Sequence, residues 1–446
     1  MTLRVPEAAS PLGTLPAAAH ASSPARSSVR WKIFGVIFLI TLINLVDRIS
    51  LSIAMPTISK EMGLSPTMQG LILSSFFWSY TLLQLPGGWL IDKIGARRVI
   101  SGATLLWGGF QVALGVASGG LGILLMRLGL GAAEAPLFPA GSKLNASWLA
   151  HGERARGAVL MDAGSPLGAA VGGLAIAQLI LLFGSWRTAF VIAGLTTVAC
   201  AWLAWRYLRD DPAQHPGVSE AELAHIRDAA GRPAVAATTT AAAAAADADA
   251  GPIPKPSVIA MCVGRASWAM IFFGLLTWGP SYLAQARSLD LKAIGASTFF
   301  IFFSATLGSL AGGFLCDALV ARGIRRGRVI KGMVVVSGLA TLAALFGLPH
   351  IADATQAVGV LCVTAFFLMW GSLYWSLPSL LVPARRVGFV GSLMNCAGSC
   401  GGILIPIVTG MLLQATGSFD AVITFFSGCA LVYVVATLFI ELRHTK

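Results

Sequence analysis

The segment GGWLIDKIGARRVI (residues 87–100) follows one long apolar run, and GGFLCDALVARGIRRGRVI (residues 312–330) follows another. Each has two adjacent glycines, an aspartate four or five residues later, and then a pair of arginines. A pattern that recurs at the same place in two parts of a chain indicates an internal repeat. The sequence therefore predicts two similar domains related by a pseudo-two-fold axis.

The composition around these segments is that of an integral membrane protein. The chain has 446 residues, of which 56% are hydrophobic and only 11% are charged. Soluble proteins have roughly 25% charged residues. The apolar runs are about 20 residues or longer and are separated by short polar loops, which predicts membrane-spanning helices rather than barrel strands.

Twelve spans can be placed, and they divide the chain into two halves. We expect an all-α membrane protein with 12 transmembrane helices in two pseudo-symmetric six-helix halves. The predicted parts are a tail (1–30), an N-terminal six-helix domain (31–208), a linker (209–256), a C-terminal six-helix domain (257–441) and a short tail (442–446). The predicted spans are 31–55, 67–91, 99–117, 120–143, 158–182, 187–208, 257–286, 295–320, 329–348, 355–381, 389–415 and 419–441.

The basic residues predict the orientation of the chain. Of the 31 Lys and Arg, four lie in loops opposite the N-terminus and three lie within spans, which leaves 24 on the N-terminal side. By the positive-inside rule both termini are cytoplasmic, in a bacterial inner membrane. The net charge of +12 reflects this topology, so no nucleic-acid partner is expected. In the linker, Ser219 and Glu222 predict a capped surface helix ahead of an Ala-rich tether at 236–251.

Among the ionisable residues of the first and fourth predicted spans, two acids and two arginines form a cluster. Asp47 and Arg48 lie about 24 Å into the first span, at a depth similar to that of Arg127 in the fourth. Glu134 comes seven residues after Arg127 and therefore shares its helix face. The side chains of Asp47 and Arg48 diverge by about 100°, whereas Asn44 shares the face of Arg48.

Such charges are costly in a membrane, so they must pair or face water. One alternative is an inert salt-bridge network that fixes the helices. The interpretation we favour is a site for an anion and a proton. The planar forks of Arg48 and Arg127 match a carboxylate, whereas the acids Asp47 and Glu134 can exist in protonated form when buried. All six histidines lie in predicted tails or loops, so proton transfer falls to the carboxylates.

These segments resemble the major facilitator superfamily. Residues 87–100 are similar to its signature between the second and third helices. The segments VDRISLSIAMP, FFWSYTLLQLPGGWLIDKIG and RLGLGAAEAPLFPA resemble its anion:cation symporter branch. That branch includes galactonate, glucarate and hexuronate carriers of bacteria and vesicular glutamate and sialic acid carriers of animals. The resemblance implies the major facilitator fold, with substrate bound between the halves near mid-membrane.

The resemblance also assigns residues. It implies that Asp47 and Glu134 couple to protons. It also implies that five further residues contact the substrate: Arg48, Arg127, Tyr80, Trp375 and Asn395. Ser165 stands where galactonate carriers have Gln, which leaves hexuronate, aldarate, tartrate or aromatic acids open. Asp162 is interpreted as a gate or loop partner. The second half contains no mid-membrane ion in this interpretation. The predicted substrate-binding residues are Arg48, Arg127, Tyr80, Asn44, Ser165, Trp375 and Asn395.

Charged residues at the membrane edge have two interpretations, topology alone or a salt-bridged latch between the halves. We favour the latch, because aspartate recurs with arginine in both halves and topology needs only positive charge. The predicted latch residues are Asp92, Arg97, Arg98, Asp317, Arg325, Arg326, Glu153 and Arg154.

The sequence thus predicts a secondary active transporter, a monomer in the lipid bilayer, that carries a small organic anion by proton-coupled symport and alternating access. A sugar acid such as a hexuronate, aldonate or aldarate is the expected substrate. The alternatives are an exchanger or facilitator, a carrier of aromatic or dicarboxylic acids, and a non-transporting sensor. No enzyme is expected, since the chain lacks a nucleotide-binding loop, a metal-ligand cluster and a nucleophile–His pair. No cofactor or metal is expected, with the proton as coupling ion. Four aromatic residues stay open between packing and substrate contact: Trp278, Tyr282, Trp370 and Tyr374.

Overall fold

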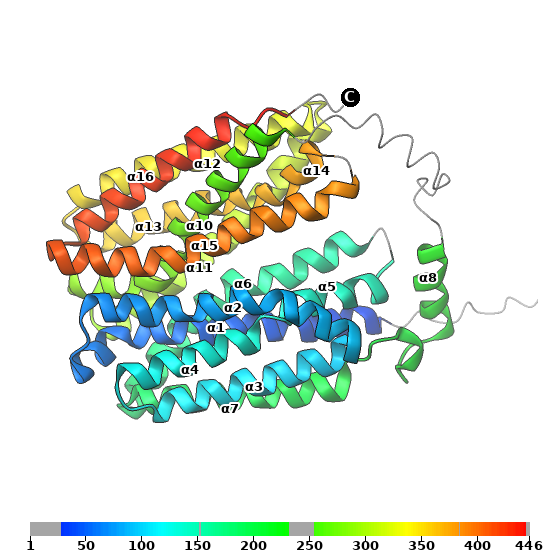
Figure 1. The fold of residues 1–446 in the computed structure, drawn as a ribbon, viewed down its shortest axis with the longest axis horizontal. Coiled ribbons are helices and arrows are strands. Elements are labelled where there is room, and N and C mark those ends of the chain that lie inside the picture. The colour runs from blue at the N-terminus through cyan, green and yellow to red at the C-terminus, as the bar shows by residue number, and fades with distance from the viewer. Residues whose placement is uncertain (1–27, 151–152, 232–253, 383, 443–446) are drawn as a thin grey trace, which may run out of the picture.

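The computed structural model describes residues 28–150, 153–231, 254–382 and 384–442, and every regular element among them is a helix. Figure 1 shows two helical bundles that run alongside each other, which we call the N half and the C half. Eleven of the described helical stretches are long and apolar enough to cross a membrane. The prediction of an all-α membrane protein is confirmed.

The helices follow the predicted spans to within a few residues. The N half contains α1 (Val29–Met62), α2 (Pro66–Ile94), α3 (Ala96–Val116), α4 (Gly119–Glu134), α5 (Leu137–Trp148), α6 (Arg154–Phe183) and α7 (Trp186–Tyr207). The C half contains α10 (Lys255–Gln285), α11 (Leu291–Ala321), α12 (Arg326–Gly347), η3 (Leu348–His350), α13 (Ala354–Leu368), η4 (Met369–Ser376), α14 (Leu377–Leu381), α15 (Ala384–Thr416) and α16 (Phe419–Leu438). The eleven stretches cover all the predicted spans except that of residues 67–91, which forms α2.

Two predicted spans are broken by proline. The fourth stops at Glu134, and α5 begins only after Pro136, which has no amide hydrogen to continue the helix. The tenth changes to a 3-10 helix over Met369–Ser376, just ahead of Pro378. A proline ring clashes with the carbonyl four residues earlier, which is here that of Tyr374.

The helix contacts repeat between the halves. In the N half α1 packs on α6, α3 on α7 and α2 on α4, and in the C half α10 packs on α15, α12 on α16 and α11 on α13. Between the halves, α6 packs on α11 and α2 on α15. Each pair in one half thus has a counterpart in the other.

One end of the molecule, which we call the linker side, carries the start of α1, the start of α10 and the linker helix α8 (Glu220–Gly231); the loop side is the opposite end (Figure 1). The halves pack tightly near the loop side. The backbone of Gly70 in α2 lies against the Pro406 carbonyl of α15, where a side chain would collide. Likewise, a Cβ atom at Gly173 in α6 would lie 2.5 Å from the Thr298 side chain of α11. Small residues therefore close the loop side in this conformation.

The linker helix α8 is fixed to the N half. The Ser219 hydroxyl accepts a hydrogen bond from the Glu222 amide at 3.2 Å, so the predicted cap is confirmed. The Glu222 carboxylate in turn accepts from the backbone amides of Val29 and Arg30 at 3.2 Å, at the first turn of α1. A carboxylate is favourable there because helix N-termini carry partial positive charge. The predicted Ala-rich tether lies outside the described residues.

Candidate functional site

A cavity of about 380 Å³ lies between the two halves on the linker side of the closed zone. Pockets for small ligands commonly have volumes of about 300–1,000 Å³. Five of the seven predicted substrate residues line it, from helices of both halves: Arg48, Tyr80, Ser165, Trp375 and Asn395.

Arg48 lies on the N-half wall and is 8% exposed. Its Nη2 donates to Glu134 Oε2 at 2.8 Å and to Asn44 Oδ1 at 3.4 Å, as the shared helix face of Asn44 and Arg48 predicts. The guanidinium lies over the rings of Phe76 and Tyr80, at 4.3 and 5.1 Å from their centroids. Arg48 is thus a positive group at the cavity wall that is fixed from behind by a buried acid.

Asp47 points away from the cavity, into the N half. Its Oδ2 accepts hydrogen bonds from Trp107 Nε1 at 3.1 Å and from the Thr197 hydroxyl at 2.6 Å. These donors come from α3 and α7, and the other carboxylate oxygen of Asp47 has no partner. The predicted divergence of Asp47 and Arg48 is confirmed, and it separates their surroundings.

Arg127 is also buried within the N half, at 1% exposure. Its guanidinium lies 5.1 Å from the centroid of Phe76, the ring that Arg48 also contacts. Neither Arg127 nor Asn44 lines the cavity, so the predicted direct contact of these two with a substrate is absent from this conformation. The reason is that α4 directs its charged face toward α1 rather than toward the interface between the halves.

The interpretation that the second half contains no buried ion is wrong. Arg265 lies about 15 Å after the start of α10, lines the cavity and is 9% exposed. Its guanidinium lies 4.2 Å from the Trp268 ring and 5.3 Å from the Trp375 ring. Trp268 comes three residues after Arg265, a helical spacing that could have indicated this stacked pair.

Two further polar groups complete the cavity. Asp162 lines it from α6 and is exposed to it, rather than lying among loop residues. Asn395 Nδ2 of α15 donates to Gln84 Oε1 of α2 at 3.4 Å, which joins the two halves across the cavity wall. The cavity therefore presents two arginines, one carboxylate and neutral hydrogen-bonding groups.

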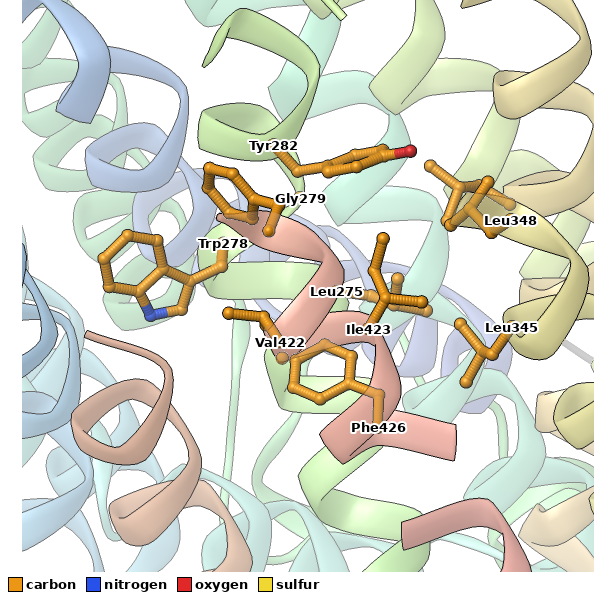
Figure 2. A pocket seen from close by; sticks show the side chains of 12 residues that line it. Leu275, Trp278, Gly279, Tyr282, Leu345, Leu348, Val422, Ile423 and Phe426 are labelled. Carbon is orange, nitrogen blue, oxygen red and sulfur yellow. The ribbon is translucent and has the colours of Figure 1, made fainter. Parts of the chain in front are cut away.

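Three of the four aromatic residues left open are packing residues. Trp278 is buried and donates to the Pro406 carbonyl, Tyr282 accepts from Arg287 Nε, and Tyr374 bonds Thr437. Figure 2 shows a second cavity, of about 30 Å³, between Trp278, Tyr282 and apolar side chains of α12 and α16. Its size and apolar walls exclude an organic anion.

The predicted latch residues of the N half bond within that half and to the linker. Asp92 pairs with Lys143 at 2.9 Å, and Arg97 Nη2 donates to the Trp205 carbonyl at 2.7 Å. Arg154 Nη2 donates to the Ala146 carbonyl at 2.9 Å. Four other predicted latch residues are exposed, namely Arg98, Asp317, Arg325 and Arg326. Among the described residues no ion pair joins the two halves. The latch, which would close this side, stays a prediction.

Glu153 belongs to a cluster beside the linker helix. Its carboxylate accepts two hydrogen bonds from Arg30, each 3.1 Å, and lies 3.4 Å from His225 Nε2 of α8. Partial burial alone would raise the pKa of Glu153, but the hydrogen bonds and charge of Arg30, with those of His225, hold it below its ordinary value. The cluster stabilises the docked linker helix.

The described residues bring together no group of three His, Cys, Asp or Glu that could hold a metal. The model of the Major Facilitator Superfamily matches residues 37–406.

Similar proteins are known from bacteria. A probable sulfoacetate transporter, SauU of Cupriavidus necator, is 31% identical over 93% of this chain and 95% of its own. A probable galactarate/D-glucarate transporter, GarP of Escherichia coli, is 30% identical over 92% of this chain and 94% of its own. A bacterial homologue of the human lysosomal transporter Spinster, solved in an inward-facing, occupied conformation, shares the fold. Its TM-score is 0.70, with 17% identity over 93% of this chain and 95% of that one.

Proposed function

The chain belongs to the Major Facilitator Superfamily, and from that premise we propose that it carries a small organic anion across the membrane together with protons. It is a transporter rather than an enzyme. A sugar acid, such as a hexuronate, aldonate or aldarate, is the proposed substrate, because relatives that match over 88–93% of the chain are named for such acids.

The observation that carries this proposal is Arg48 at the wall of the central cavity. A guanidinium binds a carboxylate through parallel hydrogen bonds, and its charge persists at any physiological pH. Because Glu134 occupies Nη2 of Arg48 at 2.8 Å, a substrate carboxylate and Glu134 compete for the same cation. Protonation of Glu134 removes its charge and leaves Arg48 available to the substrate.

This competition supplies the coupling. In the proposed cycle, Asp47 and Glu134 take up protons from outside, and Arg48 then binds the anion. Arg127, 5.1 Å from the ring of Phe76, keeps a second positive charge behind Arg48 and favours an anion at the cavity wall. Release of protons on the far side restores the Arg48–Glu134 pair and expels the substrate.

The conformation fits one stage of alternating access. The loop side is closed by small residues, and the cavity lies toward the linker side. We assign the linker side to the cytoplasm of a bacterial inner membrane, because most Lys and Arg lie there, so the conformation is inward-facing. The opposite state requires closure of the linker side, where the predicted latch residues would meet. We propose that the carrier works as a monomer with both termini in the cytoplasm.

Transport into liposomes tests the proposal. Purified protein in vesicles loaded with the pH dye pyranine should acidify the lumen when glucarate, galactarate or glucuronate is added outside. An inward proton gradient should drive accumulation, and a protonophore should abolish it. Anion movement without acidification would favour an exchanger or facilitator, in which the acids only tune the arginine charges. No movement of any organic acid would contradict the assignment.

A further inference from the structure

Arg265 is a buried cation with no partner among the described residues. Its Nε and Nη1 atoms are buried and donate no hydrogen bond, and none of the ion pairs among the described residues involves it. Burial of an arginine without an anion or acceptor is costly, so such residues face a water-filled cavity or mark a ligand. The only contacts of its guanidinium that orient it are the rings of Trp268 and Trp375.

These rings aim the guanidinium without neutralising it. Trp268 is 6% exposed and donates its own Nε1 to the Leu368 carbonyl at 2.6 Å, which fixes its position between α10 and α13. Trp375 belongs to η4, the irregular turn ahead of Pro378, and is 51% exposed. Gly398 of α15 lies against the same side chain, where a Cβ would be in van der Waals contact with Arg265 Nε at 3.4 Å. The site around Arg265 is therefore built by three elements of the C half.

Arg48 and Arg265 stand on the walls of one cavity but belong to different halves. Arg48 already has a carboxylate, that of Glu134, whereas Arg265 has none. We propose that the substrate is a dianion with an acidic group at each end, one bound by Arg48 of the N half and the other by Arg265 of the C half. This inference rests on the proposed function and specifies its substrate class.

Asp162 compensates the charge of Arg265 only from a distance. It lines the same cavity and acts electrostatically on Arg265, but no ion pair joins the two among the described residues. Its carboxylate would repel a monoanion as well as a dianion, and a second acidic group on the ligand would give Arg265 a direct ion pair while the first acidic group is bound by Arg48. Galactarate, glucarate and sulfoacetate, for which some relatives are named, have this form, whereas galactonate and hexuronate, for which other relatives are named, carry a single acidic group.

A ligand held at both ends would also tie the two halves together. Each arginine sits in the first helix of its half, α1 or α10, and these helices contact each other across the molecule. A monoanion can bind one arginine only, so it would leave the other half unrestrained. Selection for dianions is therefore built into the geometry of closure.

The test compares ligands that differ at one end only. Galactarate has a carboxylate where galactonate has a hydroxymethyl group, and glucarate and gluconate form a second such pair. Binding to purified protein is measured by calorimetry near neutral pH. The wild type should bind the dianion of a pair at least tenfold more tightly than its monoanion. Arg265→Gln should lose at least tenfold in dianion affinity and leave monoanion affinity within twofold, so that the preference disappears.

Two variants guard against an effect on folding. Arg322→Gln removes an exposed arginine at the end of α11 in the same half and should keep the full preference. Arg265→Lys keeps the positive charge but not the planar fork, and it should show a reduced preference for the dianion. It serves as the test variant if Arg265→Gln fails to fold. An undiminished preference in either Arg265 variant, or equal binding of both ligands by the wild type, overturns the inference and leaves the proposed function intact. Failure to bind any of these acids, together with no organic-acid transport in liposomes, overturns both.

Discussion

The ion pair between Arg48 and Glu134 makes a quantitative prediction for Glu134→Gln. Glutamine keeps the size of the side chain and an oxygen that can accept from Arg48 Nη2, but it removes the negative charge. Both partners are nearly inaccessible, with side chains 9% and 0% exposed. Removal of one charge from a buried pair commonly costs about 3–5 kcal/mol, because the other charge is left uncompensated.

A bound anion can recover part of that loss. A hydrogen bond to a charged group contributes about 1.5–3 kcal/mol, which corresponds to roughly 10–150-fold in affinity. Glu134→Gln should therefore melt at lower temperature without substrate, bind a sugar acid at least tenfold more tightly, and show a larger thermal shift with substrate than the wild type. Because residue 134 can no longer release a proton, gradient-driven accumulation should be lost, whereas exchange of external for internal substrate should persist.

Thermal melting, calorimetry and uptake into proteoliposomes measure these effects. The matched control is Glu61→Gln, which removes a glutamate from an ion pair with Arg187 on the loop side. The side chain of Glu61 is 42% exposed and that of Arg187 is 39% exposed. Exposed pairs are screened by water, so this variant should behave as the wild type. Unchanged affinity in Glu134→Gln, or normal accumulation driven by a proton gradient, would refute competition between Glu134 and substrate.

Three further variants test other parts of the molecule. Asp47→Asn should abolish proton-driven accumulation while sparing substrate exchange, since Asp47 bonds Trp107 behind the cavity wall; intact accumulation in liposomes would argue against its role. Asp162→Asn removes the only carboxylate that lines the cavity and should increase dianion affinity several-fold by calorimetry, and a decrease would instead indicate a ligand-binding role. Glu153 has a lowered pKa, so its contribution to linker docking is complete above its unfolded-state pKa of about 4.3 and is lost as the pH falls through the lower folded value. Hydrogen exchange in α8 should therefore accelerate over that acidic range in the wild type and accelerate less in Glu153→Gln, which keeps the contact of Glu222 with α1, and matching profiles would contradict this.

The sequence is sufficient to predict the helices and the local direction of their side chains. Apolar run length locates the spans, and helical spacing alone predicts that Asn44 meets Arg48 and that Asp47 points elsewhere. These properties depend on the backbone period and on the hydrophobic effect, which are local. They hold whichever neighbours a helix has.

The partners of each charge depend on packing between distant segments, and there the sequence is less informative. Arg265 falls among the 24 basic residues assigned to the N-terminal side, because it lies near the start of its predicted span. Only the position of Trp375, 110 residues later in the chain, shows that its guanidinium turns inward. Likewise, the burial of Arg127 behind Phe76 depends on how α4 rotates against α1, and no pattern within α4 determines that rotation.

The two walls of the cavity differ in the number of buried polar partners that surround their arginines. On one side Arg48 pairs with the buried Glu134, and its neighbour in the chain, Asp47, accepts hydrogen bonds from Trp107 and Thr197 of adjacent helices. A replacement in this part of α1 therefore affects buried groups that do not line the cavity. On the other side Arg265 contacts two indole rings, and it forms no hydrogen bond or ion pair among the described residues. Substitutions around Arg265 in the C half could therefore change which anion is bound, while the buried charged residues of the N half stay the same.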